Sequence, residues 1–324
     1  MKKLSVVVPI YNVSDYVAKA AQCLAEQAHE LLEVIAVDDG STDGSLDVFL
    51  QNMIGVDVVA ISQKNSGLSS ARNAGIQVAT SEYILFLDAD DFLLPNAVEN
   101  ILGLLECESP DVIFGRYLMW TPHSGFRKAK PYNYNPPQCK QKRMEYILCD
   151  LPDPSWNAWR YICRRDFILN NELFFIEGIL CEDVPWTLSV LEIADTIKFL
   201  QEPFYAYYHR RPGSIMNSAN PQMLVDLNGI VTNKLQKYNC SPKLCTMLVR
   251  QSFFYISEYC LFAKQDRPMV FASYQSVIPL YKKSQVIFHS IVGLFSFSIW
   301  LYLVSLGLFT VRCLYRIFTR LKYS

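Results

Sequence analysis

The sequence lacks three features that mark common classes of protein. It contains no Cys-x-x-Cys pair among its 10 cysteines, so neither a zinc site nor a disulfide framework is indicated. It has no excess of either charge, because 30 basic residues stand against 31 acidic ones, and this balance gives no support for nucleic-acid binding as the main task. The stretch before Val6 also lacks the apolar core and cleavage site of a signal peptide. We therefore expect reduced thiols and a globular part that stays in the cytoplasm.

Glycine-rich phosphate-binding loops are missing as well. The first apolar run, Leu4–Ile10, continues into Tyr11 and Asn12 instead of a glycine-rich turn, which disfavours a Rossmann dinucleotide fold, and the sequence has no P-loop. What the sequence does have is a 51% share of hydrophobic residues over 324 positions. A chain of this length and composition can bury a sizeable core, in one large domain or two smaller ones.

Apolar runs alternate with polar loops and helical segments along the first third of the chain. The predicted strands are 4–10, 32–37, 56–61 and 83–87, and the predicted helices are 14–27 with Ser14 as its N-cap, one that begins at 45, and 68–79. This βαβαβαβ alternation predicts an α/β fold with a doubly wound, mostly parallel sheet and flanking helices. Because the carboxyl ends of parallel strands share one edge, Pro9, Asp38 and Asp88 should lie together there.

A run of carboxylates follows the fourth predicted strand. Residues 83–87 are all apolar, which suits a strand buried on both faces, and Asp88-Ala89-Asp90-Asp91 comes directly after them. If extended geometry persists, Asp88 and Asp90 point to one side, and a cation must offset their repulsion. Carboxylates completed by substrate phosphates are how Mg²⁺ or Mn²⁺ is usually held. For an isolated Asp-x-Asp, a solvated turn that caps the helix from about Pro95 is the commoner interpretation, so the metal site depends on the other motifs.

Five segments, in order, resemble the motif series of glycosyltransferase family 2. They are VVVPIYN at 6–12, VDDGSTDGS at 37–45, NSGLSSARN at 65–73, FLDADD at 86–91 and Glu182-Asp183. The resemblance covers about residues 4–220 and implies a GT-A fold, a nucleotide-diphosphate sugar donor, a divalent metal ion (Mn²⁺ or Mg²⁺) and inversion at the anomeric carbon. It fixes neither the sugar nor the acceptor.

The resemblance also implies a role for each candidate site residue. Asp90 holds the metal ion between the two phosphates, Asp183 takes the proton from the acceptor hydroxyl, and Asp39 hydrogen-bonds the base. For the rest of the donor, the resemblance implies that Pro9 and Tyr11 line the pocket of the base. It also implies that Asp88 reaches the ribose side and that Arg72 lies near the diphosphate. Taken one at a time, Asp39 could be a turn residue, Arg72 a solvated helix residue and Tyr11 a core aromatic.

The acceptor side is expected in the second half of the similar region. Asp183 opens a predicted helix at 184–192, where an acidic residue could instead complement the helix dipole. Tryptophans there are candidate walls for a sugar, with core or rim packing at least as good an interpretation: Trp156, Trp159 and Trp186. The segment His209, Arg210 and Arg211 resembles a family loop that can approach phosphate or metal, although surface loops often have this composition.

The predicted organisation has three parts. Residues 1–220 form the GT-A domain, with a nucleotide-sugar half at 1–115 and an acceptor half at 116–220, and residues 221–283 form a helical extension without nameable chemistry. Residues 284–324 contain a nearly uncharged run at 286–311, long enough to span a bilayer and flanked by cations. If this run crossed the bilayer, the basic tail would lie outside the cell, which conflicts with the positive-inside tendency. We therefore expect a helix or helical hairpin that lies in the inner interface of the membrane, with its basic ends on anionic lipid. A buried core helix is the alternative.

These features together predict a metal-dependent, inverting glycosyltransferase of the hexosyltransferase type. It would lie on the cytoplasmic side of the inner membrane, peripheral or monotopic, and transfer one sugar from a UDP-sugar to a glycan or lipid-linked glycan in cell-surface polysaccharide synthesis. The absence of Gln-x-x-Arg-Trp, a motif of processive synthases, favours single addition. A GT-A-like nucleotidyltransferase is one alternative, but the glycine-rich, basic N-terminal loop that it needs is missing. A catalytically silent glycan-binding scaffold is another, and the metal carboxylates and the candidate base count against it.

Overall fold

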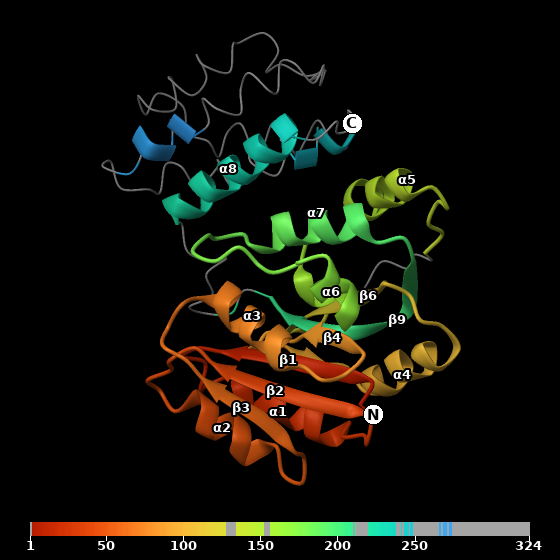
Figure 1. Ribbon diagram of the computed structural model, residues 1–324. Helices are drawn as coiled ribbons and strands as arrows, with labels where there is room; N and C mark the ends of the chain where they lie inside the picture. The colour runs from red at the N-terminus through yellow and green to blue at the C-terminus, as the bar shows by residue number, and fades with distance from the viewer. Residues whose placement is uncertain are drawn as a thin grey trace. The chain divides into compact units, whose positions relative to one another are not determined.

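The computed structural model describes residues 2–127, 134–151, 156–209, 211, 220–237, 241, 243–245, 247–248, 266, 268–270 and 272–273 (Figure 1). The chain divides into two compact units. The first comprises Met1–Ile147, Leu151–Gly178 and Glu182–Arg211, and the second comprises Leu148–Asp150, Ile179–Cys181 and Pro212–Ser324. The expected membrane segment at 286–311 and its basic tail lie outside the described residues. Within the described ranges, no helix is both long enough and apolar enough to cross a membrane.

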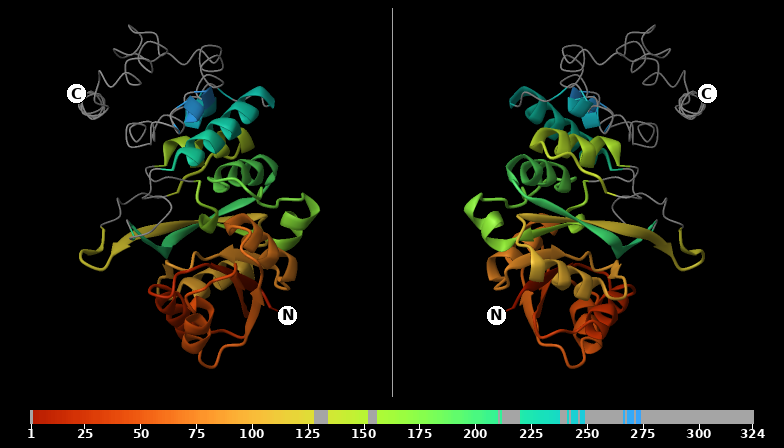
Figure 2. Two further views of the ribbon diagram at one scale, coloured as in Figure 1. Left: turned by 90° about the vertical axis from the view of Figure 1, so that its left-hand side faces the viewer. Right: turned by 90° about the vertical axis from the view of Figure 1, so that its right-hand side faces the viewer.

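Four parallel strands form the first half of the sheet in the first unit, in the order β3-β2-β1-β4 (Figures 1 and 2). They are β1 (Leu4–Ile10), β2 (Leu32–Asp38), β3 (Val58–Ser62) and β4 (Tyr83–Phe86). Every residue of β1 and β4 is buried, whereas β3 lies at the edge of the sheet and is partly exposed. β1 and β4 are thus central strands covered on both faces, as the sequence predicts.

Three helices connect these strands: α1 (Val17–Glu26), α2 (Ser45–Asn52) and α3 (Leu68–Val78). The buried side of α1 shares one core with Val6 and Val8 of β1, whereas α3 packs against Val7, which points to the opposite face. Gly75 allows this approach, because a Cβ at that position would come within 2.2 Å of Val7 Cγ1. This close packing fixes how far α3, the helix that carries Arg72, lies from the sheet.

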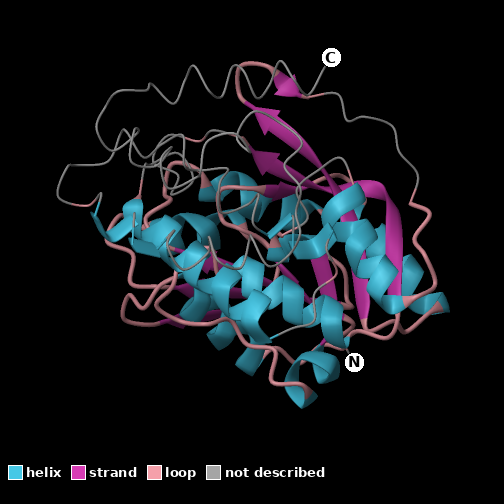
Figure 3. Ribbon diagram, turned by 90° about the horizontal axis from the view of Figure 1, so that it is seen from above, coloured by secondary structure: helices cyan, strands magenta, loops and turns pink. Residues whose placement is uncertain are grey.

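The second half of the sheet is mixed, which corrects the predicted mostly parallel arrangement. β8 (Tyr161–Arg164) runs antiparallel both to β4 and to β6 (Val112–Thr121), and β6 runs parallel to β9 (Ile197–Tyr208). The short strands β5 (Phe92–Leu93) and β7 (Gly125–Phe126) pair antiparallel with β9 and β6. The long strands are drawn in magenta in Figure 3. Apart from β6 with β7, these pairs join segments far apart in the chain, so no local alternation of strand and helix predicts them.

The loops after β1 and β2 are tied together, and this changes the predicted start of α1. The sequence predicts Ser14 as the N-cap, but α1 begins at Val17 and the residue before it, Tyr16, makes no side-chain cap. The Ser14 N–H instead donates to Asp43 Oδ2 at 2.9 Å, across the two loops. The predicted cap is wrong because Ser14 lies in a loop that the β2–α2 loop holds in place.

The remaining elements belong to the first unit, except that the last residues of the π-helical turn, Leu148–Asp150, belong to the second unit. They are α4 (Ala97–Cys107), α5 (Lys140–Glu145), a π-helical turn (Tyr146–Asp150), a 3₁₀ turn (Ala158–Arg160), α6 (Arg165–Asn170) and α7 (Asp183–Ile193). The second unit includes α8 (Pro221–Lys237), which lies within the predicted helical extension. The start of α7 at Asp183 puts that carboxylate at a helix N-terminus.

Candidate functional site

The loops that follow β1, β2 and β4 meet at one edge of the sheet, as predicted. Ile10 is in register with Asp38, and the Leu87 N–H donates to the Val7 carbonyl at 2.9 Å. Pro9 is buried within β1, whereas the Tyr11 side chain beyond the strand is 47% exposed. The alternative interpretation of Tyr11 as a core aromatic is therefore wrong, and its ring lies open to a ligand.

Asp39 organises the loop that leads into α3. Its side chain is only 3% exposed. Oδ1 accepts hydrogen bonds from Gln63 Nε2 at 2.8 Å and the Ser66 N–H at 2.9 Å, and Oδ2 accepts one from the Gly67 N–H at 2.8 Å. The carboxylate therefore fixes the backbone just before the helix that carries Arg72.

Arg72 is the centre of a buried ionic cluster. Nη1 lies 2.7 Å from Asp183 Oδ1 and 3.0 Å from Glu182 Oε1, and Nη2 lies 2.8 Å from Asp88 Oδ1. The Arg72 side chain is 1% exposed, so it is not the solvated helix residue of the alternative interpretation. Burial alone would lower the pKa of Arg72, but the charges of Asp183, Asp88 and Glu182 raise the pKa above its ordinary value. The guanidinium therefore remains a cation in the core.

An aromatic wall supports this cluster. The Arg72 guanidinium lies 5.1 Å from the centroid of the Phe175 ring and 5.9 Å from that of Phe86. Asn73 holds Phe175 in place with two hydrogen bonds, from Asn73 Nδ2 to the Phe175 carbonyl and from the Phe175 N–H to Asn73 Oδ1. Sequence reasoning missed Phe175 and the ionic role of Glu182, although both lie in segments that it singled out.

Asp183 is a carboxyl group with an unusual affinity for protons. Asp183 is the first residue of α7, and its side chain is 20% exposed. Burial raises the pKa of Asp183 to about 7, and the charges of Glu182 and Asp88 add to this effect, although Arg72 opposes it. A group that exchanges its proton near neutral pH has the property required of a general base.

The Asp88–Asp91 turn is held by two different kinds of partner. Asp90 Oδ2 forms an ion pair with Arg211 Nε, whereas Asp91 accepts hydrogen bonds of 2.7 Å from the Tyr205 hydroxyl and from the Tyr208 N–H. Burial and the nearby Asp88 raise the pKa of Asp90, with Arg211 acting against them. Asp91 is 2% exposed, and burial raises its pKa well above the ordinary value. Asp91 therefore anchors the turn, and Asp90 is the carboxylate of the pair that a ligand can reach.

Asp90 fits a metal ion only as one ligand among several. In the part of the chain that the structure describes, no group of three or more His, Cys, Asp or Glu side chains could hold a metal ion. Mg²⁺ and Mn²⁺ are commonly held by one or two carboxylates, with phosphate oxygens and water completing the set. The Asp90 carboxylate, 22% exposed at the ligand edge of the sheet, fits such a partial set.

The three candidate tryptophans are packing residues. Trp156, Trp159 and Trp186 are each less than 9% exposed. Trp159 stacks on Tyr205 at 4.1 Å between ring centroids, and Trp186 stacks on Phe175 at 4.8 Å. Trp159 thus supports the tyrosine whose hydroxyl donates to Asp91, and sequence reasoning missed Tyr205 because it stands in an apolar run.

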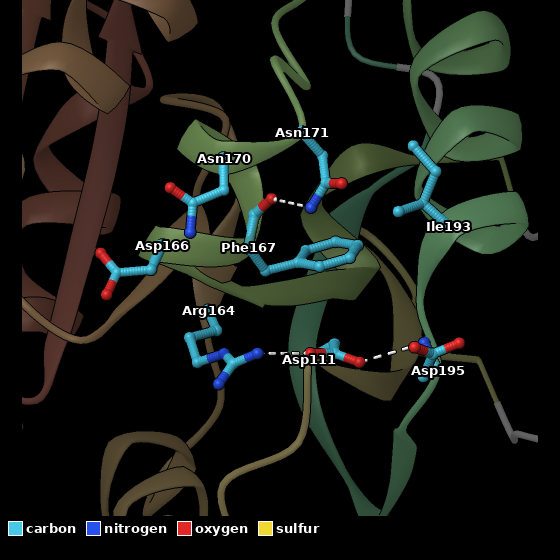
Figure 4. A pocket seen from close by; sticks show the side chains of 8 residues that line it. All are labelled: Asp111, Arg164, Asp166, Phe167, Asn170, Asn171, Ile193 and Asp195. Carbon is cyan, nitrogen blue, oxygen red and sulfur yellow. Dashed lines mark hydrogen bonds and ion pairs between the residues drawn. The ribbon is translucent and has the colours of Figure 1, made fainter.

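A polar pocket of about 360 Å³ lies apart from this cluster (Figure 4). It is lined by Asp111, Arg164, Asp166, Phe167, Asn170, Asn171, Ile193 and Asp195. Arg164 is in register with Tyr83, the first residue of β4, so the pocket lies at the opposite end of that strand from Asp88. Asp111 binds Arg164 Nη2 and accepts from the Asp195 and Thr196 N–H groups, which makes this a structural junction.

Comparison with known proteins identifies the family. The sequence model described as "Glycosyl transferase family 2" matches residues 5–163. Glycosyltransferase GlyG of Streptococcus pneumoniae serotype 4 is 31% identical over 226 residues, which are 66% of this chain and 73% of GlyG. The chain therefore belongs to glycosyltransferase family 2.

Other relatives match over part of their length. Glycosyltransferase YibD of Escherichia coli K12 is 30% identical over 217 residues, or 64% of this chain and 61% of YibD. The crystal structure of S. aureus TarS 1-349 in complex with UDP-GlcNAc has a TM-score of 0.68 and 22% identity, and covers 86% of this chain and 81% of that one. This likeness shows the fold, which is the GT-A type of α/β fold.

Proposed function

We propose that this protein is an inverting glycosyltransferase that moves a single sugar from a nucleotide-diphosphate sugar to an acceptor hydroxyl. The donor is a UDP-sugar, and TarS, the poly(ribitol-phosphate) β-N-acetylglucosaminyltransferase of Staphylococcus aureus, supports this choice because it has been crystallised with UDP-GlcNAc. The acceptor is a glycan or lipid-linked glycan of cell-surface polysaccharide synthesis.

One observation carries the proposal: Arg72 joins Asp183 to the carboxylate turn after β4. Asp183 and Asp88 are bound to the two terminal nitrogens of one guanidinium, at 2.7 and 2.8 Å. A candidate base and the turn expected to face the donor therefore lie within one ionic cluster. Transfer needs this proximity, because the acceptor hydroxyl must meet the anomeric carbon beside the base.

In the proposed reaction Asp183 takes the proton of the acceptor hydroxyl. The acceptor oxygen then bonds to the anomeric carbon from the face opposite the diphosphate, and the bond from that carbon to the phosphate oxygen breaks. The electron pair leaves with the nucleoside diphosphate, and the proton remains on Asp183 Oδ until it passes to solvent. A pKa of about 7 lets Asp183 perform this cycle near neutral pH.

On the donor side, Tyr11 and Pro9 line the base pocket, Asp39 binds the base, Asp88 reaches the ribose and Arg72 lies near the diphosphate. Tyr11, a residue 47% exposed after β1, is accessible for this part. Asp90 would hold Mn²⁺ or Mg²⁺, which when bound supplies a Lewis acid for the charge that develops on the leaving diphosphate. Because Arg72 is buried against Asp88 and Asp183, its part near the diphosphate is to hold these two carboxylates in position.

We further propose that the protein works on the cytoplasmic side of the inner membrane, as a peripheral or monotopic protein. The sequence of 284–324, apolar and then basic, supports this attachment. A tag placed after Ser324 should resist external protease in intact spheroplasts. Cleavage of that tag would contradict the interfacial placement and indicate a span.

The direct test is a panel of nucleotide sugars offered to the purified full chain with Mn²⁺ or Mg²⁺ and a lipid-linked acceptor extract. Release of nucleoside diphosphate that depends on the acceptor, together with a single added sugar, is the expected result. Release of pyrophosphate from a nucleoside triphosphate and a sugar phosphate would instead identify a nucleotidyltransferase. No turnover of any donor would leave only a binding role and refute the proposal.

A further inference from the structure

Arg211 stands beside Asp90, where a bound cation would also have to lie. Its Nε pairs with Asp90 Oδ2, and the two side chains are only 14% and 22% exposed. The guanidinium also lies over the Tyr16 ring, 4.8 Å from its centroid, which adds a cation–π contact. The arginine is therefore held in this position from two directions.

Each carboxylate of the turn already has a partner without a metal ion. Asp88 pairs with Arg72, Asp90 pairs with Arg211, and Asp91 accepts hydrogen bonds. Repulsion between neighbouring carboxylates, which makes such a turn bind divalent ions, is thus reduced by two guanidinium groups, one of which is shared with Glu182 and Asp183. A divalent ion that approached Asp90 would meet a positive charge bound to the same carboxylate.

We propose that Arg211 and the divalent ion bind Asp90 in competition, so that Arg211 has to leave before the ion is held. This inference rests on the proposed function, because it takes Asp90 as the metal ligand. It follows that the donor-free protein binds Mn²⁺ weakly. A donor diphosphate adds negative charge at the same place, so donor and ion should bind with positive coupling.

The test is Mn²⁺ binding to the donor-free full chain, followed by the electron paramagnetic resonance signal of the free ion. Arg211→Gln should raise the affinity for Mn²⁺ about tenfold, since it removes a positive charge next to the ligand oxygens. Arg211→Lys keeps the charge and should stay near the wild type. Arg127→Gln removes an equal charge from an exposed position and should change nothing, and Asp90→Asn placed in the Arg211→Gln chain should cancel the gain.

Equal Mn²⁺ affinity of the wild type and Arg211→Gln, whether strong or too weak to detect, would overturn the competition. A gain that survives Asp90→Asn would do so as well. Thermal unfolding checks each variant, and Arg211→Met gives a second neutral replacement should the first be poorly folded. Donor turnover is measured in parallel: Mn²⁺-stimulated release without a change in Mn²⁺ binding overturns only the competition, whereas no release under any condition counts against the proposed function.

Discussion

The two arginines at the site differ in how deeply their surroundings bury them. Arg72 is 1% exposed and binds three carboxylates that come from two separate segments. Arg211 is 14% exposed and pairs with Asp90, which is itself 22% exposed. A buried cluster cannot lose one member without leaving uncompensated charge, whereas a pair with more access to water can exchange its cation at lower cost. Arg72 therefore marks the fixed side of the site, and under the proposed competition the Asp90–Arg211 pair is the replaceable side.

The largest effect is expected for Arg72→Gln. It should lower the free energy of unfolding by about 3–5 kcal/mol, because Asp88, Glu182 and Asp183 are left near one another without their cation. Urea denaturation measures the effect. Arg127→Gln, at an exposed position, should stay within about 0.5 kcal/mol of the wild type. A loss for Arg72→Gln as small as that of the control would show that the cluster does not stabilise the fold.

The next largest effect is expected for Asp183→Asn. This change keeps the shape but removes the proton acceptor, so transfer should fall by a factor of about 10² to 10⁴ while donor affinity is retained. Steady-state transfer and donor binding are measured on the same preparation. Asp166→Asn, a 74% exposed aspartate near the other pocket, is the matched control. Donor affinity that fell as steeply as the rate would place Asp183 in the nucleotide site.

Asp90→Asn tests the replaceable side. A neutral amide cannot supply the charged oxygen that a divalent ion needs beside two phosphates, so metal-dependent donor binding should weaken by about tenfold or more. Titration of Mn²⁺ against turnover at fixed donor measures this. Undiminished turnover at limiting metal would remove Asp90 from the metal assignment.

The smallest expected effect is a dependence on pH. Asp183 has to be deprotonated to act as a base, and burial raises its pKa to about 7. The value of kcat/KM should therefore fall about tenfold for each pH unit below 7 and level off above it. A profile that stays flat down to pH 5 would show that the acting base has an ordinary carboxyl pKa.

The sequence predicts the parallel half of the fold well because its signals are local. Strand 83–87 is an unbroken apolar run, strand 4–10 is interrupted only by Ser5, and the loops after them have the residues that turns and helix starts require. Ser14 shows the limit of local signals: its N–H binds Asp43, 29 residues further on, and this decides where α1 begins. The mixed half could not be predicted, because the pairing of β8 with β4 and β6 depends on partners distant in sequence.

In the candidate site, too, the features with local sequence signals were predictable and the long-range contacts were not. The motif residues lie at the sheet edge where the strand pattern puts them, and Tyr11 lies open beyond β1. The partners of Arg72 were not predictable, since 111 residues separate it from Asp183 and no periodicity connects the two. The Tyr205 hydroxyl reaches Asp91 over 114 residues, from the apolar run that ends β9.

The bracing between the two loops after β1 and β2 has a thermodynamic consequence for the proposed donor. Asn12 Oδ1 accepts from the Thr42 N–H at 2.8 Å, and Ser45 Oγ accepts from the Val13 N–H at 2.7 Å. Loops already fixed in this way lose little conformational entropy when a nucleotide arrives, so little of the binding free energy goes into ordering the chain. Calorimetry of nucleoside diphosphate binding should therefore show a small entropic penalty, and a mutation that loosens the braces should appear first as a less favourable binding entropy.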